Sequence, residues 1–88
     1  MDCSGKVAIP GFVNMHTHAA MSLLRGIGED MLFPDWLAKI WKVEEKVDSE
    51  FVYWGTKVAC LEMIRTGTTT FNDQYWYHSA SIKAAEEM

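Results

Sequence analysis

The sequence predicts an α/β fold in which parallel strands are covered by helices. Two short runs rich in β-branched and aromatic residues, about 12–16 and 68–72, are typical of strands. A long stretch with helical periodicity separates them, and the order strand, helix, strand implies a right-handed parallel crossover. The first run is apolar on both faces up to its polar end, which is typical of a strand covered on both sides.

The segments around the first strand carry clear turn signals. Residues 6–9 are short and extended, and Pro10-Gly11 punctuates them before the strand begins. Residues 19–26 follow the strand and could form either a loop or a helical turn. Gly26 and Gly28 argue against a long helix there, because glycine is a poor helix former.

A first helix is predicted from Pro34, which suits the first helical position because its missing N–H has no helical partner there. Four apolar residues then recur on one helical face, and we expect them to be core residues: Trp36, Leu37, Ile40 and Trp41. The alternative for the two tryptophans is that one of them lines the binding site of an aromatic substrate, since flat rings stack well on one another.

A second, longer helix is predicted to run to about Arg65. Asp48 or Ser49 can cap its start, and Gly67 is well placed as a left-handed terminator. One face of this helix carries Val52, Gly55, Ala59 and Met63. The two small residues on this face, Gly55 and Ala59, would permit close approach to the sheet.

The most informative chemistry lies where the first strand ends, at His16 and His18. Side chains alternate along a strand, so these imidazoles point the same way and Thr17 points the opposite way. Two such nitrogens can converge on one metal ion, at about 2.0–2.1 Å for zinc. A His-x-His pair alone is a weak signal, because such pairs also hydrogen-bond within cores. Its position favours a metal, since active sites of parallel α/β folds form at the carboxyl ends of strands.

A family resemblance is carried by two blocks of sequence, PGFVNMHTHAAMSLLRG and, further on, EMIRTGTTTFND. They resemble the amidohydrolase superfamily, and more narrowly its S-adenosylhomocysteine/methylthioadenosine deaminase and chlorohydrolase-like branch. The resemblance covers residues 2 to about 73. It implies a metal-dependent (β/α)8 TIM barrel, of which this chain would hold the first two strands and the intervening helices, because a complete barrel needs about 250 residues.

The resemblance also suggests how the chain is divided. Residues 1–9 would be the tail of the β-sandwich segment that precedes the barrel in this family. Residues 10–88 would be the first βαβα portion of the barrel. Both ends of the chain look cut, because the earlier sandwich strands are absent and the last residues stop within a helical pattern.

The resemblance implies that His16 and His18 are two ligands of one divalent metal ion, commonly zinc. The remaining ligands and the proton-transferring aspartate would come from later strands, so no catalytic residue is expected in this chain. Catalytic zinc needs three protein ligands and an open position. We therefore expect these 88 residues alone to bind zinc weakly and to have no hydrolytic activity.

Glu44 is the carboxylate that the resemblance singles out for substrate binding. The family branch often shows Ile-Trp-Pro-x-Glu, and this chain reads Ile40-Trp41-Lys42-Val43-Glu44, so Lys42 departs from the pattern. That glutamate holds the ribose hydroxyls in adenosine-type deaminases, and a carboxylate can accept two hydrogen bonds from a vicinal diol. The alternative is an exposed acid at a helix end, and Glu45 could take the role by a shift of one residue.

The function that the resemblance implies is hydrolytic deamination of a purine nucleoside-like substrate, such as S-adenosylhomocysteine or methylthioadenosine. Two alternatives stay open. One is a different amidohydrolase, such as a guanine or cytosine deaminase or a chlorohydrolase. The other is a small α/β interaction module without enzymatic activity, in which the two histidines are structural.

Two other polar residues are not expected to be metal ligands. Asp73 follows the second strand at the functional edge, but we expect it to bond loop backbone. His78 is expected in an aromatic, polar loop, before a last helix that Ser79 or Ser81 can begin.

The composition limits the classes of partner that the chain is expected to bind. Eight Lys and Arg against 12 Asp and Glu give a net charge of −4, and the positive charges are scattered, which argues against nucleic acid and anionic membranes. No apolar run reaches about 18 residues. Cys3 and Cys60 have no motif spacing and are expected to be reduced thiols of a cytoplasmic protein. The expected partner is a small-molecule substrate, and the intact enzyme could form a homo-oligomer.

Overall fold

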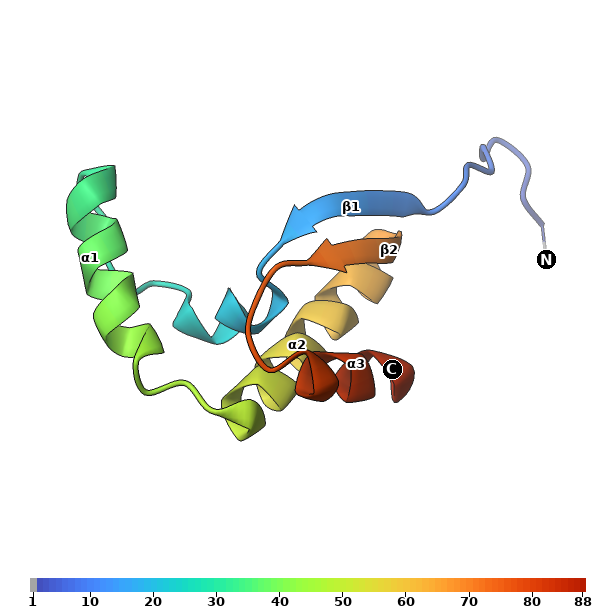
Figure 1. The fold of residues 1–88 in the computed structure, drawn as a ribbon. Helices are drawn as coiled ribbons and strands as arrows, with labels where there is room; N and C mark the ends of the chain where they lie inside the picture. The colour runs from blue at the N-terminus through green and yellow to red at the C-terminus, as the bar shows by residue number, and fades with distance from the viewer. Residues whose placement is uncertain (1) are drawn as a thin grey trace.

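The computed structural model describes residues 2–88 and shows a two-stranded parallel sheet with helices beside it (Figure 1). The elements in chain order are β1 (Phe12–Thr17), the 3-10 helix η1 (Ala19–Leu24), α1 (Phe33–Glu44), α2 (Ser49–Thr66), β2 (Thr68–Asp73) and α3 (His78–Glu86). Both predicted strands and their parallel pairing are confirmed. No helix in this described part of the chain is long and apolar enough to cross a membrane.

The pairing of β1 with β2 brings their carboxyl ends together. Phe12 pairs with Thr68 at one end of the register and Thr17 pairs with Asp73 at the other. Beyond the strands, the Gln74 N–H donates to the Thr17 carbonyl oxygen at 2.8 Å. The segment that follows β2 is therefore held against the segment that follows β1, where the two histidines lie.

Helix α2 has the ends that the sequence predicts. The Asp48 carboxylate accepts a hydrogen bond from the Phe51 N–H at 2.8 Å and caps the start. Gly67 ends the helix with a φ of +87°, a left-handed conformation that glycine adopts without steric cost. Between these caps the helix is regular, so local chemistry accounts for both of its limits.

The close approach expected at Gly55 exists, but its partner is η1 rather than the sheet. A Cβ placed on Gly55 would lie 2.4 Å from the carbonyl oxygen of Ala20. The Ser22 hydroxyl also donates to the Gly55 carbonyl oxygen at 2.8 Å. The expectation of contact with the sheet is corrected for this position, because η1 lies between this part of α2 and the strands.

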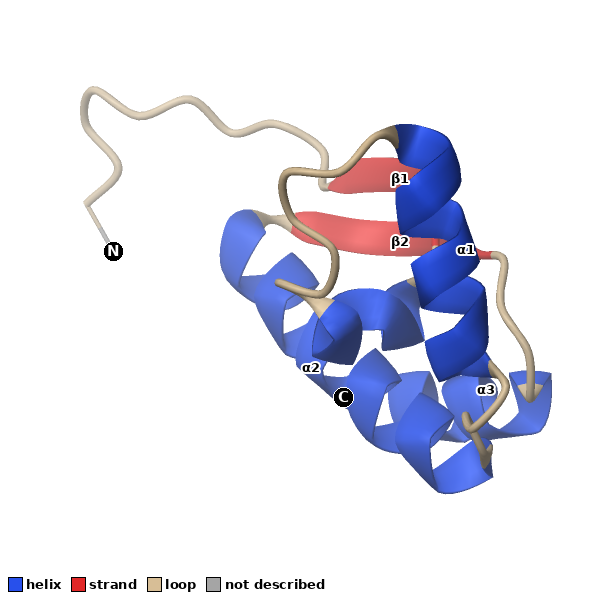
Figure 2. Ribbon diagram, turned by 90° about the vertical axis from the view of Figure 1, so that its left-hand side faces the viewer, coloured by secondary structure: helices blue, strands red, loops and turns tan. Residues whose placement is uncertain are grey.

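The helices α2 and α3 lie on one side of the sheet, as Figure 2 shows. The core cluster forms there from Ala20, Val47, Val52 and Tyr75. On β1 itself, Phe12, Val13 and Met15 are 57%, 56% and 69% exposed. The expectation that both faces of β1 are covered is therefore not met among residues 2–88. The apolar side chains of this strand therefore lie on surfaces that the rest of residues 2–88 does not cover.

Helix α1 stands to one side of the other elements (Figure 1). It begins at Phe33, so Pro34 is the second helical residue rather than the first. Of its predicted core face, Ile40 is 2% exposed, whereas Trp41 is 58% exposed. The core assignment is thus right for Ile40 and wrong for Trp41. The physical reason is that this face turns toward a cavity rather than toward a packed element.

The segment before β1 extends away from the folded body (Figure 1). Val7 is 86% exposed and Ile9 is 65% exposed, so neither side chain packs into the core. The division at residue 10 between a sandwich tail and the barrel stays a prediction, and Met1 lies outside the described residues.

Candidate metal and substrate site

The two histidines of the first strand face each other. His16 lies within β1, and His18 follows the last strand residue and caps η1. Their Nε2 atoms are 3.4 Å apart, and the ring planes meet at 86°. The side chains therefore converge on one side of the backbone, as the alternation of a strand predicts. Both side chains are exposed, so the shared space between the nitrogens is open.

The spacing of the two nitrogens fits a single tetrahedral metal ion. Two bonds of about 2.0–2.1 Å at a tetrahedral angle place their nitrogen atoms about 3.3–3.4 Å apart. The observed 3.4 Å matches that separation. Imidazole nitrogen is also among the preferred ligands of zinc. The donor set and its geometry therefore suit zinc, while the assignment of the two residues as ligands stays a prediction.

The tautomer of His18 is set by a backbone group. Its Nδ1 lies 2.5 Å from the carbonyl oxygen of Gln74. A carbonyl oxygen can only accept, so Nδ1 carries the proton and donates it. In the neutral ring, Nε2 then keeps its lone pair and points toward His16. Such a hydrogen bond orients metal-binding histidines in many proteins. The sequence alone does not reveal this role of Gln74, because a backbone carbonyl leaves no signal in residue identity.

Asp73 hydrogen-bonds to the backbone of the segment that follows β1, as predicted. One oxygen of its carboxylate, Oδ1, accepts a hydrogen bond from the Ala19 N–H at 2.8 Å. The other oxygen, Oδ2, is buried and has no hydrogen-bond partner within residues 2–88. Ala19 directly follows His18, and Asp73 directly precedes Gln74. Asp73 and the residue that follows it, Gln74, therefore both hold the chain in place around His18.

Glu44 lies at the last position of α1 and is half-buried. The hydroxyl of Tyr75 donates to Glu44 Oε1 at 2.9 Å. Burial, and after it the hydrogen bond and the negative charge of Glu44, raise the pKa of the Tyr75 phenol well above its ordinary value. The phenol therefore stays protonated and acts as a donor. Tyr75 is a second residue whose role the sequence alone does not reveal.

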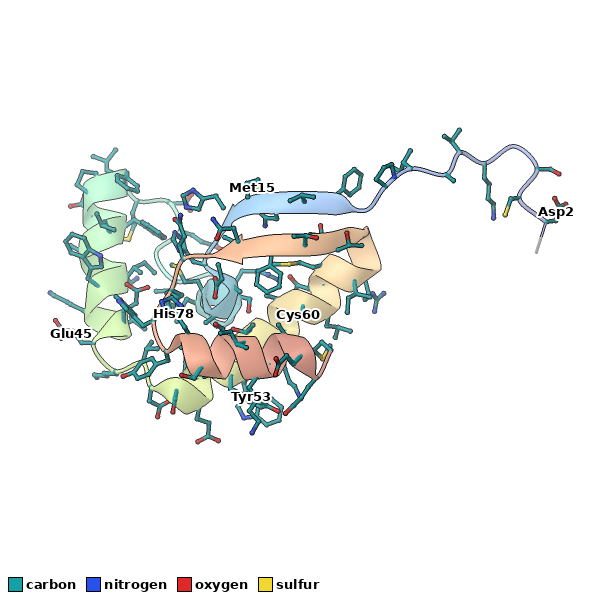
Figure 3. The ribbon with its side chains drawn as sticks, turned by 45° about the vertical axis from the view of Figure 1, so that its right-hand side comes forward. Asp2, Met15, Glu45, Tyr53, Cys60 and His78 are labelled. Carbon is teal, nitrogen blue, oxygen red and sulfur yellow. The ribbon has the colours of Figure 1, made fainter. Side chains whose placement is uncertain are left out.

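A cavity of about 540 Å³ connects the two parts of the predicted site. His18 and Glu44 both line it, and its apolar wall includes side chains from α1 and from the segment after β2: Trp36, Leu37, Ile40, Trp41, Tyr75 and Trp76. Glu45 is exposed, does not line this cavity and lies at the end of α1 in Figure 3. Glu44 therefore shares a cavity with His18 whereas Glu45 does not, and Trp36 and Trp41 both lie in the wall of that cavity. The substrate roles of these residues stay predictions.

His78 also borders this cavity, but the prediction of a loop is wrong for it. His78 is the first residue of α3, one position before Ser79 (Figure 3). Tyr77, in a left-handed conformation, caps the helix, so the backbone itself turns into α3 there. His78 joins no group of three or more metal-ligating side chains. No such group exists anywhere in residues 2–88. This part of the chain thus contributes a pair of imidazoles rather than a complete metal site.

Comparison with known proteins places this geometry in a family. The model of the amidohydrolase family matches residues 7–88, which is most of the chain. The chain belongs to the amidohydrolase family. This amidohydrolase segment is also similar in structure to an adenosine deaminase from Xanthomonas campestris with bound zinc, at a TM-score of 0.84 and 41% identity. That similarity covers 89% of this chain and 18% of the other.

Curated relatives of this amidohydrolase segment are named as deaminases. It is 57% identical to a 5′-deoxyadenosine deaminase of Methanoregula boonei, over 99% of this chain and 20% of the relative. It is 53% identical to 5-methylthioadenosine/S-adenosylhomocysteine deaminase 1 of Archaeoglobus fulgidus, over 99% of this chain and 21% of the relative. The chain therefore spans about a fifth of the length of the curated relatives that it matches.

Proposed function

We propose that the full-length protein is a metal-dependent deaminase of adenosine-type nucleosides. The observation that carries this proposal is the shared cavity: His18, one half of a metal-compatible pair, and Glu44, a carboxylate suited to a diol, line the same 540 Å³ space. The similarity to deaminases of 5′-deoxyadenosine and of 5-methylthioadenosine/S-adenosylhomocysteine supports the substrate class.

In this proposal His16 and His18 hold one divalent ion, zinc, through their Nε2 atoms. When bound, the ion supplies the Lewis acidity that makes water a nucleophile at neutral pH. The residues of this chain provide the orientation. The Gln74 carbonyl fixes the His18 tautomer at Nδ1, and the Asp73 carboxylate holds the backbone N–H of the next residue, Ala19.

Glu44 binds the ribose in this proposal. Its Oε1 already accepts from Tyr75, while its remaining lone pairs can accept from the two hydroxyls of a vicinal diol. The aromatic wall, which includes Trp36 and Trp41, suits the flat purine ring. Base and ribose would then lie in one cavity, with the reacting end of the base toward His18.

The test is turnover by the full-length, zinc-loaded protein. Ammonia release is measured with adenosine, 5′-deoxyadenosine, methylthioadenosine and S-adenosylhomocysteine. Guanine and cytosine, also followed by ammonia release, and a chlorinated triazine, followed by chloride release, are the comparison substrates. We expect kcat/KM to be highest for the adenosine-type nucleosides.

Two outcomes would count against the proposal. Preference for a free base or for the triazine would assign the protein to another activity of the same family. No turnover of any substrate by a folded, zinc-loaded protein would favour a role without hydrolysis.

A further inference from the structure

Tyr75 joins three separate parts of the proposed site. Its hydroxyl donates to Glu44 in α1. Its ring lies 6.4 Å from the His18 ring, centroid to centroid. Its backbone directly follows Gln74, whose carbonyl oxygen accepts from His18 Nδ1. One short segment after β2 thus contacts both the imidazole pair and the carboxylate.

The ring of Tyr75 is a rigid anchor. The residue is 8% exposed and belongs to the core cluster with Ala20, Val47 and Val52. A buried ring has few accessible rotamers, so the hydroxyl at its tip occupies a fixed position. The Glu44 side chain has three rotatable bonds and is only half-buried. In this pair, Tyr75 therefore determines where the Glu44 carboxylate lies.

The surroundings of α1 make this hydrogen bond important. α1 stands to one side of the other elements (Figure 1). Within residues 2–88, the Tyr75–Glu44 contact is the only side-chain hydrogen bond that joins α1 to another part of the chain. Without it, the carboxylate could rotate into solvent. A displacement of about 1 Å is enough to weaken a positioned contact strongly.

We propose that Tyr75 is a positioning residue that fixes the Glu44 carboxylate for a vicinal diol and so makes the enzyme select ribonucleosides over 2′,3′-dideoxynucleosides. This inference rests on the proposed function, and it adds a residue and a selectivity that the metal pair and Glu44 do not supply by themselves. Tyr75 acts through Glu44 and need not touch the substrate.

The experiment compares adenosine with 2′,3′-dideoxyadenosine as substrates of the full-length, zinc-loaded protein. The Tyr75→Phe variant removes one oxygen atom and keeps the ring. We expect the ratio of kcat/KM values, diol over dideoxy, to fall about tenfold in this variant, because hydrogen bonds to charged groups are among the stronger ones. We expect the loss mainly in KM for adenosine, and we expect the zinc content to stay at the wild-type level.

Four further variants keep the result interpretable. Tyr77→Phe, two residues along and 49% exposed, removes an equivalent hydroxyl and should leave the ratio unchanged. Tyr75→Met fills the buried site without a polar atom and replaces the Phe variant if thermal unfolding shows that the latter does not fold. Tyr75→Phe in a Glu44→Ala background should lower the ratio no further than Glu44→Ala alone.

The outcomes separate this inference from the proposed function. If Glu44→Ala lowers the ratio and folded Tyr75→Phe does not, the role of Tyr75 is overturned while the ribose role of Glu44 stands. If Glu44→Ala leaves the ratio unchanged, the ribose role fails and the inference fails with it. If Tyr75→Phe lowers activity on both substrates equally, Tyr75 serves only the fold, and the inference is also overturned.

Discussion

Asp73 accepts a hydrogen bond from the backbone N–H of Ala19 at 2.8 Å, across 54 positions of sequence. Ala19 is 2% exposed, so this donor has no access to solvent as an alternative partner. The contact therefore ties the end of β2 to the residue directly after His18. It links the stability of the fold to the geometry of the imidazole pair.

The first prediction concerns that contact. In the full-length protein, Asp73→Ala should lower the free energy of unfolding by about 1–3 kcal/mol, because it leaves a buried N–H unpaired. Asp73→Asn keeps an amide oxygen that can accept from Ala19 and should cost less. Urea titration followed by circular dichroism measures both. Equal losses in the two variants would show that the Ala19 contact does not account for the effect.

The second prediction concerns zinc. His16→Ala and His18→Ala should each reduce the zinc affinity of the full-length protein by at least about tenfold, because each removes one of the two proposed ligands. His78→Ala is the matched control, since it removes an imidazole near the same cavity but outside the pair. Equilibrium dialysis with metal analysis measures all three. Retention of wild-type affinity in both ligand variants would exclude the pair as metal ligands.

The third prediction concerns the packing of α2 on η1. Alanine is a better helix former than glycine by about 1 kcal/mol, which alone would make Gly55→Ala stabilising. Its Cβ would lie 2.4 Å from the Ala20 carbonyl oxygen and 2.8 Å from Ala20 Cα. Both are backbone atoms that cannot rotate away, so we expect a net loss of about 1–3 kcal/mol.

The control for this packing prediction is Lys39→Ala, at an exposed site of α1. It should change the stability by no more than about 0.5 kcal/mol. A Gly55→Ala protein that is as stable as the wild type would mean that η1 can move away from α2.

The fourth prediction concerns thiol reactivity. Burial, and after it the negative charge of Asp73, raise the pKa of Cys60, which lies in α2 beneath β2 (Figure 3). At about pH 8 the folded protein should therefore hold less Cys60 thiolate than the unfolded chain, and alkylation should spare Cys60 until urea is added. Exposed Cys3 is the internal comparison.

The raised pKa of Cys60 also predicts how the stability of the fold depends on pH. Because its folded-state pKa lies above the unfolded value, its contribution to folding is complete below the unfolded pKa and is lost as the pH rises through the folded pKa.

Mass spectrometry of alkylated peptides measures the reactivity of the Cys60 thiol. Equal labelling of Cys60 in the native and urea-unfolded protein would contradict the burial of this thiol.

The fifth prediction concerns these 88 residues in isolation. They contain two of the ligands of the proposed metal site, whereas catalytic zinc needs three protein ligands and an open position. We expect weak zinc binding and no release of ammonia from adenosine-type nucleosides. Calorimetry with zinc and an ammonia assay measure the two properties. Robust turnover by this segment alone would contradict the proposed division of the active site.

The sequence by itself determined the features that depend on neighbouring residues. The β-branched run before His16 predicted β1, and the residues Asp48 and Gly67 predicted the two ends of α2, because caps act within one turn of helix. The two-residue spacing of His16 and His18 predicted that their rings face each other, since strand alternation is a local property. These features needed no knowledge of the rest of the fold.

Only the tertiary structure decided which distant groups complete the site. The Gln74 carbonyl lies 56 positions from His18, and the Tyr75 hydroxyl lies 31 positions from Glu44. A backbone carbonyl has the same chemistry in every residue, and a tyrosine in an aromatic segment gives no sign of its partner. The contact of Gln74 with His18 arises from the parallel pairing of β1 with β2, which brings the two strand ends together in space while they remain far apart in sequence. The contact of Tyr75 with Glu44 depends in addition on where α1 lies beside the segment that follows β2.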